Sequence, residues 1–239
     1  VLGMISSAQA ATVNLKYLGQ TGNTQNVKVK HTNISAATGH FSLGVFKFKD
    51  MDADQTVYTM CIDPQLIAHK NTVIDYDIAP LTDAPINDFN QPDTMDAAQA
   101  NALGQLWHNV VVDGYSGDLS ALAGDSTTPK DAAAFQLAIW ETVWEDDASA
   151  IWDVSNGNGN FYATNNSDVR NIANNMLGDI DIAGGSIASL DALVSEDYQD
   201  QAVLQSSYQQ PAIPLPSAAM AGLVLLGLTG KFSRSRRVG

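Results

Sequence analysis

Two side chains, those of Cys61 and Gln136, have the chemistry to form a covalent bond with each other. Cys61 is the only cysteine of the chain and lies in the segment VYTMCIDPQ, so it cannot form an internal disulfide. It is therefore an inert small hydrophobic residue, an intermolecular partner or a nucleophile. A thiolate that attacks a glutamine carboxamide can expel ammonia and leave a thioester, provided that the fold joins the side chains and shields them from water.

Gln136 lies on the predicted buried face of a helix. In residues 132–146, AAAFQLAIWETVWED, the spacing i, i+3, i+4, i+7, i+8, i+11 and i+12 defines one helical face. Its members are Ala132, Phe135, Gln136, Ile139, Trp140, Val143 and Trp144. A buried carboxamide without partners costs roughly 1–3 kcal/mol. Gln136 therefore needs either hydrogen-bond partners or a chemical use.

The helix that carries Gln136 is expected to begin at residue 128. Thr128 precedes Pro129 and Lys130, with Asp131 at the third position, which is typical of an N-cap followed by proline at N1 and an acid at N3. Cys61, in contrast, is placed at the end of a strand that the Asp63-Pro64 turn terminates.

The residues around both side chains resemble a known family. Met60-Cys61-Ile62-Asp63, followed much later by Phe135-Gln136-Leu137-Ala138-Ile139-Trp140-Glu141, is similar to the thioester domain of bacterial surface adhesins, a pattern also seen in secreted PEP-CTERM proteins. The resemblance covers about residues 40 to 180. It departs from the family pattern at Met60, where an aromatic residue is usual, and at Phe135, where the adhesins prefer threonine.

This resemblance implies a fold and an activity. The fold is mainly β with helical insertions (α+β), an antiparallel sandwich or barrel-like architecture. The activity is covalent capture of host or matrix nucleophiles, typically amines, through a Cys61–Gln136 thioester, with no cofactor or metal. Four residues would form the surroundings of the bond: Asp63, Phe135, Ile139 and Trp140. The alternative is that Gln136 bonds backbone groups of a neighbouring strand while Cys61 only packs.

The elements that must position this pair follow from hydropathy patterns. NVKVKH and GVFKFKD alternate apolar residues with lysines, which predicts half-buried antiparallel strands. Further strands are expected at 12–18, 40–43, 56–62 and 72–78, with a last one near 205. Helices are expected at 96–109 and at 168–177, the latter with Ser167 as its N-cap and Gly178 as its stop.

The two ends of the chain predict export. Residues 1–10 end in Ala8-Gln9-Ala10, which is typical of the tail of a secretory signal cleaved after Ala10. Residues 211–239 contain a Pro-Leu-Pro turn, an apolar run from 217 to 230 and a basic end. The residues of this tail motif are Pro214, Leu215, Pro216, Arg234, Arg236 and Arg237.

This tail resembles the PEP-CTERM sorting signal in its Val-Pro-Leu-Pro-Ala-like variant. The resemblance implies transient membrane insertion of the C-terminal helix and processing by an exosortase-type transpeptidase. Residues 11–210 would then form the extracellular domain, located at the cell envelope, the surface or the extracellular matrix. An ordinary single-pass anchor is the alternative interpretation of the tail.

Other candidate chemistry has less support. Asp50 to Asp54 begins like an EF-hand loop, but Gln55 and Cys61 stand where glycine and glutamate are needed, so a solvated acidic turn is expected. The polar loop 153–160 is a weak calcium candidate, and the histidines show no metal spacing. Glu141 and Glu145 are expected on a solvated helix face.

The charge balance excludes nucleic-acid binding as a function. The net charge is -14, and only Lys130 and Arg170 are basic between residues 71 and 210. The sequence thus predicts a secreted, non-enzymatic surface or matrix protein acting in adhesion, whose target is an extracellular polysaccharide or a surface amine. A noncovalent structural or glycan-binding matrix protein is the alternative, and a matrix hydrolase is a third class.

Overall fold

The computed structural model describes most of the chain up to residue 207. The described residues are 11–21, 24–34, 38–88, 91–124, 128, 130–145, 152–155, 157, 159–181 and 184–207. The chain divides into two compact units, Val1–Tyr208 and Gln209–Gly239. The predicted signal cleavage site at Ala8 and Ala10 and the whole predicted sorting tail lie outside the described residues. In the part that is described, no helix is long and apolar enough to cross a membrane.

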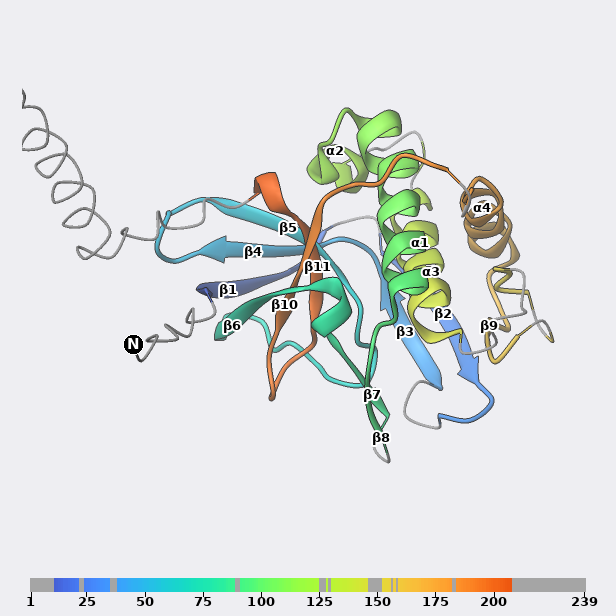
Figure 1. The fold of residues 1–239 in the computed structure, drawn as a ribbon, viewed down its shortest axis with the longest axis horizontal. Coiled ribbons are helices and arrows are strands. Elements are labelled where there is room, and N and C mark those ends of the chain that lie inside the picture. Colours follow the sequence, from blue (N-terminus) through green and yellow to red (C-terminus); the bar gives the residue numbers. More distant parts are fainter. Residues whose placement is uncertain are drawn as a thin grey trace, which may run out of the picture. The chain divides into compact units, whose positions relative to one another are not determined.

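Six antiparallel strands form a closed barrel, which Figure 1 shows with its strands labelled. Around the barrel the order is β1-β4-β5-β11-β10-β6. The strands are β1 (Thr12–Gln20), β4 (Phe46–Asp50), β5 (Thr56–Cys61), β6 (Val73–Pro80), β10 (Leu190–Val194) and β11 (Gln201–Leu204). The expected mainly β fold with helical insertions is confirmed, and of the two expected architectures the barrel is the observed one.

Alternating burial accounts for the first strands of the barrel. In β4, Phe46 and Phe48 are buried while the intervening lysines are partly exposed, because successive side chains of a strand point to opposite faces. Tyr17 of β1 pairs with Phe48, and its ring lies 5.1 Å from that of Phe48. The register shifts between Tyr17 and Gly19, a bulge that Gly19 accommodates with φ +113°.

A second sheet lies beside the barrel. Its order is β3-β2-β9, formed by β3 (Gly39–Leu43), β2 (Gln25–His31) and β9 (Phe161–Ala163). Val27 and Val29 of β2 are fully buried, as the alternation in NVKVKH predicts. A separate hairpin consists of β7 (Pro85–Asp88) and β8 (Gln91–Thr94).

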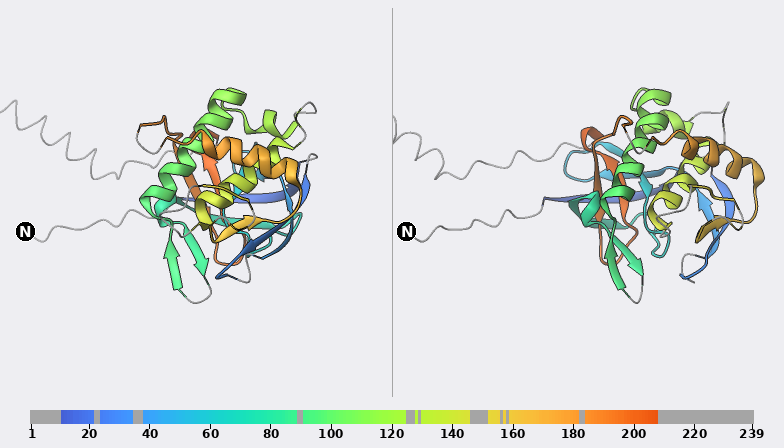
Figure 2. Two further views of the ribbon diagram at one scale, coloured as in Figure 1. Left: turned by 90° about the vertical axis from the view of Figure 1, so that its right-hand side faces the viewer. Right: turned by 45° about the vertical axis from the view of Figure 1, so that its right-hand side comes forward.

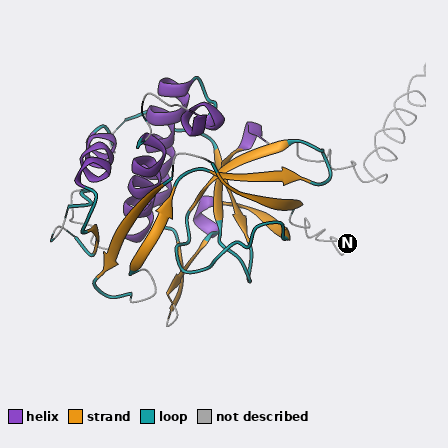
Figure 3. Ribbon diagram, turned by 180° about the vertical axis from the view of Figure 1, so that it is seen from behind, coloured by secondary structure: helices purple, strands orange, loops and turns teal. Residues whose placement is uncertain are grey.

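The helices gather at one side of the barrel, as Figures 1 and 3 show from opposite directions. They are α1 (Ala97–Trp107), a π-helical turn η3 (His108–Asp113), α2 (Leu119–Gly124), α3 (Asp131–Trp144) and α4 (Ser167–Gly178). Single 3-10 turns are η2 (Leu81–Asp83) and η4 (Gln205–Ser207). Figure 2 shows α3 packed among α1, α4 and the smaller sheet. Every residue of α3 from Ala132 to Trp144 is buried.

Two predicted helix starts are wrong. Helix α3 begins at Asp131, three residues after the expected cap, because the chain first makes a turn in which the Asp131 N–H donates to the Thr128 carbonyl at 3.1 Å. Helix α4 is capped by Asn166 instead of Ser167. Asn166 adopts a left-handed conformation at φ +52°, and its side chain accepts the N–H of Val169.

Candidate functional site

Cys61 is the last residue of β5 and is completely buried. On one side, its strand pairs with β11, where Gln201 is its register partner. The chain then turns at Asp63, whose side chain accepts the N–H of Gln65 at 2.8 Å. The turn ends the strand where the expected Asp63-Pro64 signal placed it. Among the described residues, no strand pairs with Cys61 and Ile62 on the side that faces helix α3, because β4 pairs with β5 only as far as Thr59.

The side chain of Gln136 takes the place of that missing strand. Its Oε1 accepts the N–H of Cys61 at 3.0 Å, and its Nε2 donates to the Cys61 carbonyl at 2.7 Å. A peptide group of an adjacent strand would make the same two hydrogen bonds. The predicted inward direction of Gln136 is confirmed, since its side chain is fully buried. The fold therefore brings Cys61 and Gln136 together across 75 residues of sequence.

Two tryptophans extend this contact along the next turns of α3. The Trp140 Nε1–H donates to the Cys61 carbonyl at 3.0 Å, and the Trp144 Nε1–H donates to the Ile62 carbonyl at 2.9 Å. Gln136, Trp140 and Trp144 follow one another at four-residue spacing, which places them on one helix face. Three polar side chains of one helix thus fix the end of β5 through its backbone.

The thiol of Cys61 is held in its protonated form. Its Sγ–H donates to the Asp63 carbonyl at 3.1 Å, and the cysteine is not in a disulfide. Burial raises the pKa of Cys61 well above its ordinary value, and the negative charge of Asp63 raises it further. A thiol with a raised pKa is a weak nucleophile until its proton is removed.

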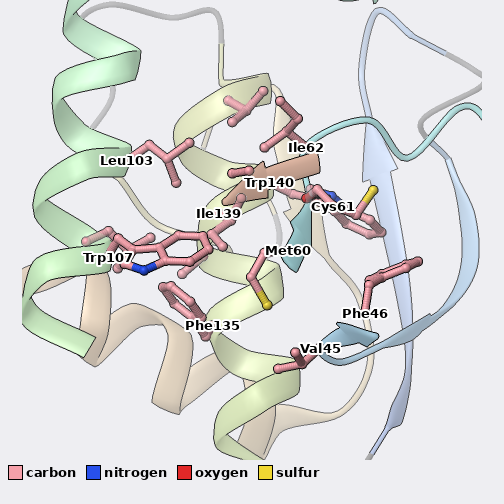
Figure 4. Close-up of a cluster of buried hydrophobic side chains, with 14 of the residues drawn as sticks. Val45, Phe46, Met60, Cys61, Ile62, Leu103, Trp107, Phe135, Ile139 and Trp140 are labelled. Carbon is pink, nitrogen blue, oxygen red and sulfur yellow. Dashed lines mark hydrogen bonds between the residues drawn. The ribbon is translucent and has the colours of Figure 1, made fainter. Parts of the chain in front are cut away.

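The residues predicted to surround the Cys61–Gln136 bond lie on two different sides of the buried cluster. Figure 4 shows the Cys61 sulfur on the Trp140 side of the cluster and Phe135 on the Trp107 side. The rings of Phe135 and Trp107 are 5.4 Å apart in an edge-to-face arrangement. Ile139 and Asp63 are both buried. Trp140 thus covers the sulfur side of the site, while Phe135 belongs to the packing between α3 and α1.

A cavity of about 220 Å³ leads from the surface to Gln136 and Trp140. Its walls come from β1, β3 and β4, from the loop after β5, and from Gln199. Phe41 and Trp140 meet edge to face there, with ring centroids 5.3 Å apart. The carboxamide of Gln136 therefore lies directly behind the wall of a surface cavity, while its own side chain has 0% exposure.

A buried acid on the β11 side of Cys61 was not predicted. Asp200 is fully buried, its Oδ1 accepts the N–H of Ser195 at 2.8 Å, and its carbonyl accepts the N–H of Ile62 at 3.0 Å. Burial raises the pKa of Asp200 to about 8, with a contribution from the charge of Asp63. The local sequence SEDYQDQAVL gives no signal that separates this aspartate from surface acids.

The prediction of a solvated acidic face on α3 is wrong for Glu141 and Glu145. Glu141 is fully buried, and its Oε1 accepts the N–H of Asp153 at 2.9 Å. Burial is the main cause that raises the pKa of Glu141 to about 8. Glu145 accepts the N–H of Asn160 at 2.7 Å, beside Gly159, where a side chain would collide with the carboxylate. The two glutamates fasten the polar loop to the helix, and this contact excludes the solvated face.

The acidic turn at Asp50 and the histidine His31 make hydrogen bonds to the protein backbone. The acidic turn was expected to be solvated. Asp50 is instead buried and accepts the N–H groups of Asp52 and Ala53, both at 2.9 Å, while residues 51–54 are exposed. Within the described ranges no group of three or more His, Cys, Asp or Glu side chains could hold a metal ion. His31 makes a 2.9 Å hydrogen bond between its Nε2 and the Trp144 carbonyl.

A solved structure is similar to this chain, whereas the sequence comparisons find no match. No protein-family model matches the chain, and no curated protein matches it. Among solved structures, it is similar to the N-terminal thioester domain of a surface protein from Clostridium perfringens, with 9% sequence identity and a TM-score of 0.39. The match covers 80% of this chain and 97% of that domain. At this TM-score, the chemistry must be judged from the geometry of Cys61 and Gln136 themselves.

Proposed function

We propose that this protein is a single-use covalent binder, in which Cys61 and Gln136 form an internal thioester that captures an amine. The carrying observation is the pair of hydrogen bonds, of 3.0 and 2.7 Å, that joins the Gln136 carboxamide to the backbone of Cys61. They hold the acyl carbon beside the residue that bears the thiol, and such fixed proximity can replace a large part of a reaction barrier.

The same contact supplies a reason for reactivity. The Cys61 N–H points at Oε1 of Gln136, the oxygen on which negative charge develops when sulfur attacks the carbonyl carbon. In the reaction, an S–C bond forms and the C–N bond breaks. The thiol proton moves to the departing nitrogen, which leaves as ammonia. No cofactor or external reagent is needed, and the completed thioester would lie in a buried, apolar site.

Capture reverses the first step with a new nitrogen. An amine that reaches the acyl carbon forms an N–C bond, the S–C bond breaks, and one amine proton passes to sulfur. The product is an amide at Gln136 and a free thiol at Cys61, so the protein reacts once and does not turn over. We therefore place it among binders and not among enzymes.

The two ends of the sequence support a location outside the cytoplasm. The Ala8-Gln9-Ala10 pattern and the tail with Pro214-Leu215-Pro216 and its terminal arginines support export and exosortase-dependent sorting to the cell surface or matrix. A domain of residues 11–210 would then act outside the cytoplasm, in adhesion to polysaccharide or to surface amines. The strongly negative charge supports a partner other than nucleic acid.

One observation favours a second function, a noncovalent structural or glycan-binding matrix protein. The carboxamide of Gln136 already has partners at both of its polar atoms, and the thiol already donates to Asp63. A glutamine used only to complete a strand edge would look the same. The two functions differ in whether the thiol can react before an amine is added.

A thiol-release assay separates the two functions. Native protein is treated with methylamine or buffer, then denatured in an alkylating reagent at mildly acidic pH, where a thioester persists. The thioester predicts that Cys61 becomes alkylated only after methylamine. Gln136→Glu is the matched control, because it keeps the size of the side chain but has no ammonia to expel, and its Cys61 should be alkylated in both samples. Equal alkylation of the native protein with and without methylamine would leave the noncovalent function.

A further inference from the structure

The cavity that reaches Gln136 restricts which amine can enter. At about 220 Å³, it is smaller than ordinary ligand pockets, which measure roughly 300–1,000 Å³. It has room for one side chain or one sugar ring and not for a stretch of polymer. Gln136 and Trp140 are the two most buried residues of its lining, with exposures of 0% and 2%, so a nucleophile that approaches the acyl carbon through this cavity passes between the other walls.

The walls carry no fixed charge. Among the described residues that line the cavity there is no carboxylate, lysine or arginine, and the one histidine, His40, is exposed. Tyr17 is neutral, since burial raises the pKa of its phenol to about 12. A positively charged ammonium would leave water here without an opposite charge to pair with, which is unfavourable. The amine that enters must therefore be uncharged.

An uncharged amine is rare for lysine and common for an amino sugar. With a pKa of about 10.4, roughly one lysine side chain in 2,500 is uncharged at pH 7. The oxygen atoms next to the amine of a hexosamine withdraw electrons and lower its pKa towards the range of α-amino groups, about 7.7–8.0. Roughly one such amine in ten is then uncharged at pH 7, so amino sugars are favoured before any contact is made.

The shape and chemistry of the walls also suit a sugar ring. Tyr17 and Phe46 stack with their ring centroids 5.6 Å apart, and Phe41 and Trp140 form the edge-to-face pair near Gln136. Aromatic rings cover the apolar faces of sugars, while amide and hydroxyl groups bond their hydroxyls. Gln20 and Ser42 supply such groups in the same cavity. At its mouth, Ile67 is 67% exposed, an apolar surface on which a larger glycan could rest.

We infer that the nucleophile captured at Gln136 is the free amine of a hexosamine unit in a polysaccharide, and that the cavity lined by Tyr17, Phe41 and Trp140 binds its ring. This inference rests on the proposed thioester. In the capture step, the sugar nitrogen forms a bond to the acyl carbon of Gln136, the S–C bond breaks, and a proton passes from nitrogen to the Cys61 sulfur. The glycan ends in amide linkage to the protein.

The test compares two amines on the full-length protein by intact mass. Methyl glucosaminide and Nα-acetyl-lysine methylamide, which has no carboxylate, are supplied at several pH values, and each capture rate is divided by the fraction of amine that is uncharged. We expect the sugar to remain at least tenfold faster after this correction. Methyl glucoside, which has the same ring and no amine, should slow the capture of methylamine. Equal or faster corrected capture of the lysine compound, or no slowing by methyl glucoside, would overturn the inference.

Variants separate ring binding from thioester formation. Phe41→Ala should lose the advantage of the sugar over the lysine compound while the untreated protein still lacks one ammonia. Ile187→Ser, which changes an exposed isoleucine away from the cavity, should keep both properties. An untreated wild-type protein of full unmodified mass would overturn the proposed function and this inference together. A protein short of ammonia with no preference for the sugar would overturn this inference alone.

Discussion

At the scale of the single residue, Gln136 has a structural role in the unreacted protein. It completes the hydrogen bonds of Cys61, which lies at the end of a barrel strand where no other strand of the described chain pairs with it on that side. A buried backbone group left without a partner costs roughly 1–3 kcal/mol. The stability of the protein should therefore depend on the carboxamide more than on the thiol.

Replacement of Gln136 by alanine should lower the free energy of unfolding by about 2–4 kcal/mol, because it removes packing and leaves the Cys61 N–H without its acceptor. Neither variant can form the thioester, so both lose that cross-link equally. Apart from this shared loss, Cys61→Ala keeps the hydrogen bond and should cost less, about 1–2 kcal/mol. Urea denaturation of both variants beside the wild type measures the difference. A Gln136→Ala variant as stable as the wild type would contradict the structural role.

At the scale of the element, α3 is unusual because hydrogen-bonding side chains are buried on two of its faces. Gln136, Trp140 and Trp144 bind the end of β5, while Glu141 and Glu145 bind the loop before β9. The hydropathy pattern predicted the first face and missed the second. A hydropathy pattern predicts that an acidic residue is solvent-exposed unless the segment that covers it is known. Here the covering segment is a loop, which has no hydropathy periodicity.

The buried Glu141 predicts a pH-dependent stability. Its folded-state pKa of about 8 lies above the ordinary value of 4.5, so between these pH values the folded protein binds more protons than the unfolded chain. The contribution of Glu141 to the free energy of unfolding is then fully present below about pH 4.5 and is lost as pH rises towards 8. Asp200 acts in the same direction. Glu141→Gln should flatten this decline in thermal melts recorded from pH 5 to 9, whereas an unchanged slope would show that Glu141 ionises freely.

The cap of α4 gives a sharper test of an element boundary. Asn166→Ala should cost about 1 kcal/mol, since it removes the side-chain acceptor of the Val169 N–H and places alanine at positive φ. Asn166→Gly tolerates that conformation and should cost less. Ser167→Ala, at the position that the sequence pattern indicated as the cap, should be nearly neutral. Equal losses for Asn166→Ala and Ser167→Ala in denaturant titrations would contradict the observed cap.

At the scale of the whole molecule, the sequence predicts those barrel strands whose two faces differ. β1, β4 and β6 alternate because one face contacts the core and the other contacts water. β10 was missed, since four of its five residues are buried and its pattern LDALV does not alternate. β9 has three residues, which are too few to show the alternating hydropathy of a strand.

The candidate site was predicted in part for the same kind of reason. The inward direction of Gln136 follows from helical spacing, and the end of the strand at Cys61 follows from the Asp-Pro turn. Their contact across the fold came from a resemblance and not from any local pattern. The burial of Asp200 and the cavity lined by Tyr17, Phe41 and Trp140 depend on how the barrel and the smaller sheet are placed. No local segment of the sequence predicts that placement.

The intact mass of the untreated, full-length protein tests the central claim most directly. A thioester between Cys61 and Gln136 predicts a mass lower than that of the unmodified chain by one ammonia. The deficit should be absent from both Cys61→Ala and Gln136→Ala, and methylamine should convert it to a single adduct. A wild-type protein of full unmodified mass, with Cys61 alkylated once the chain is denatured, would contradict the account.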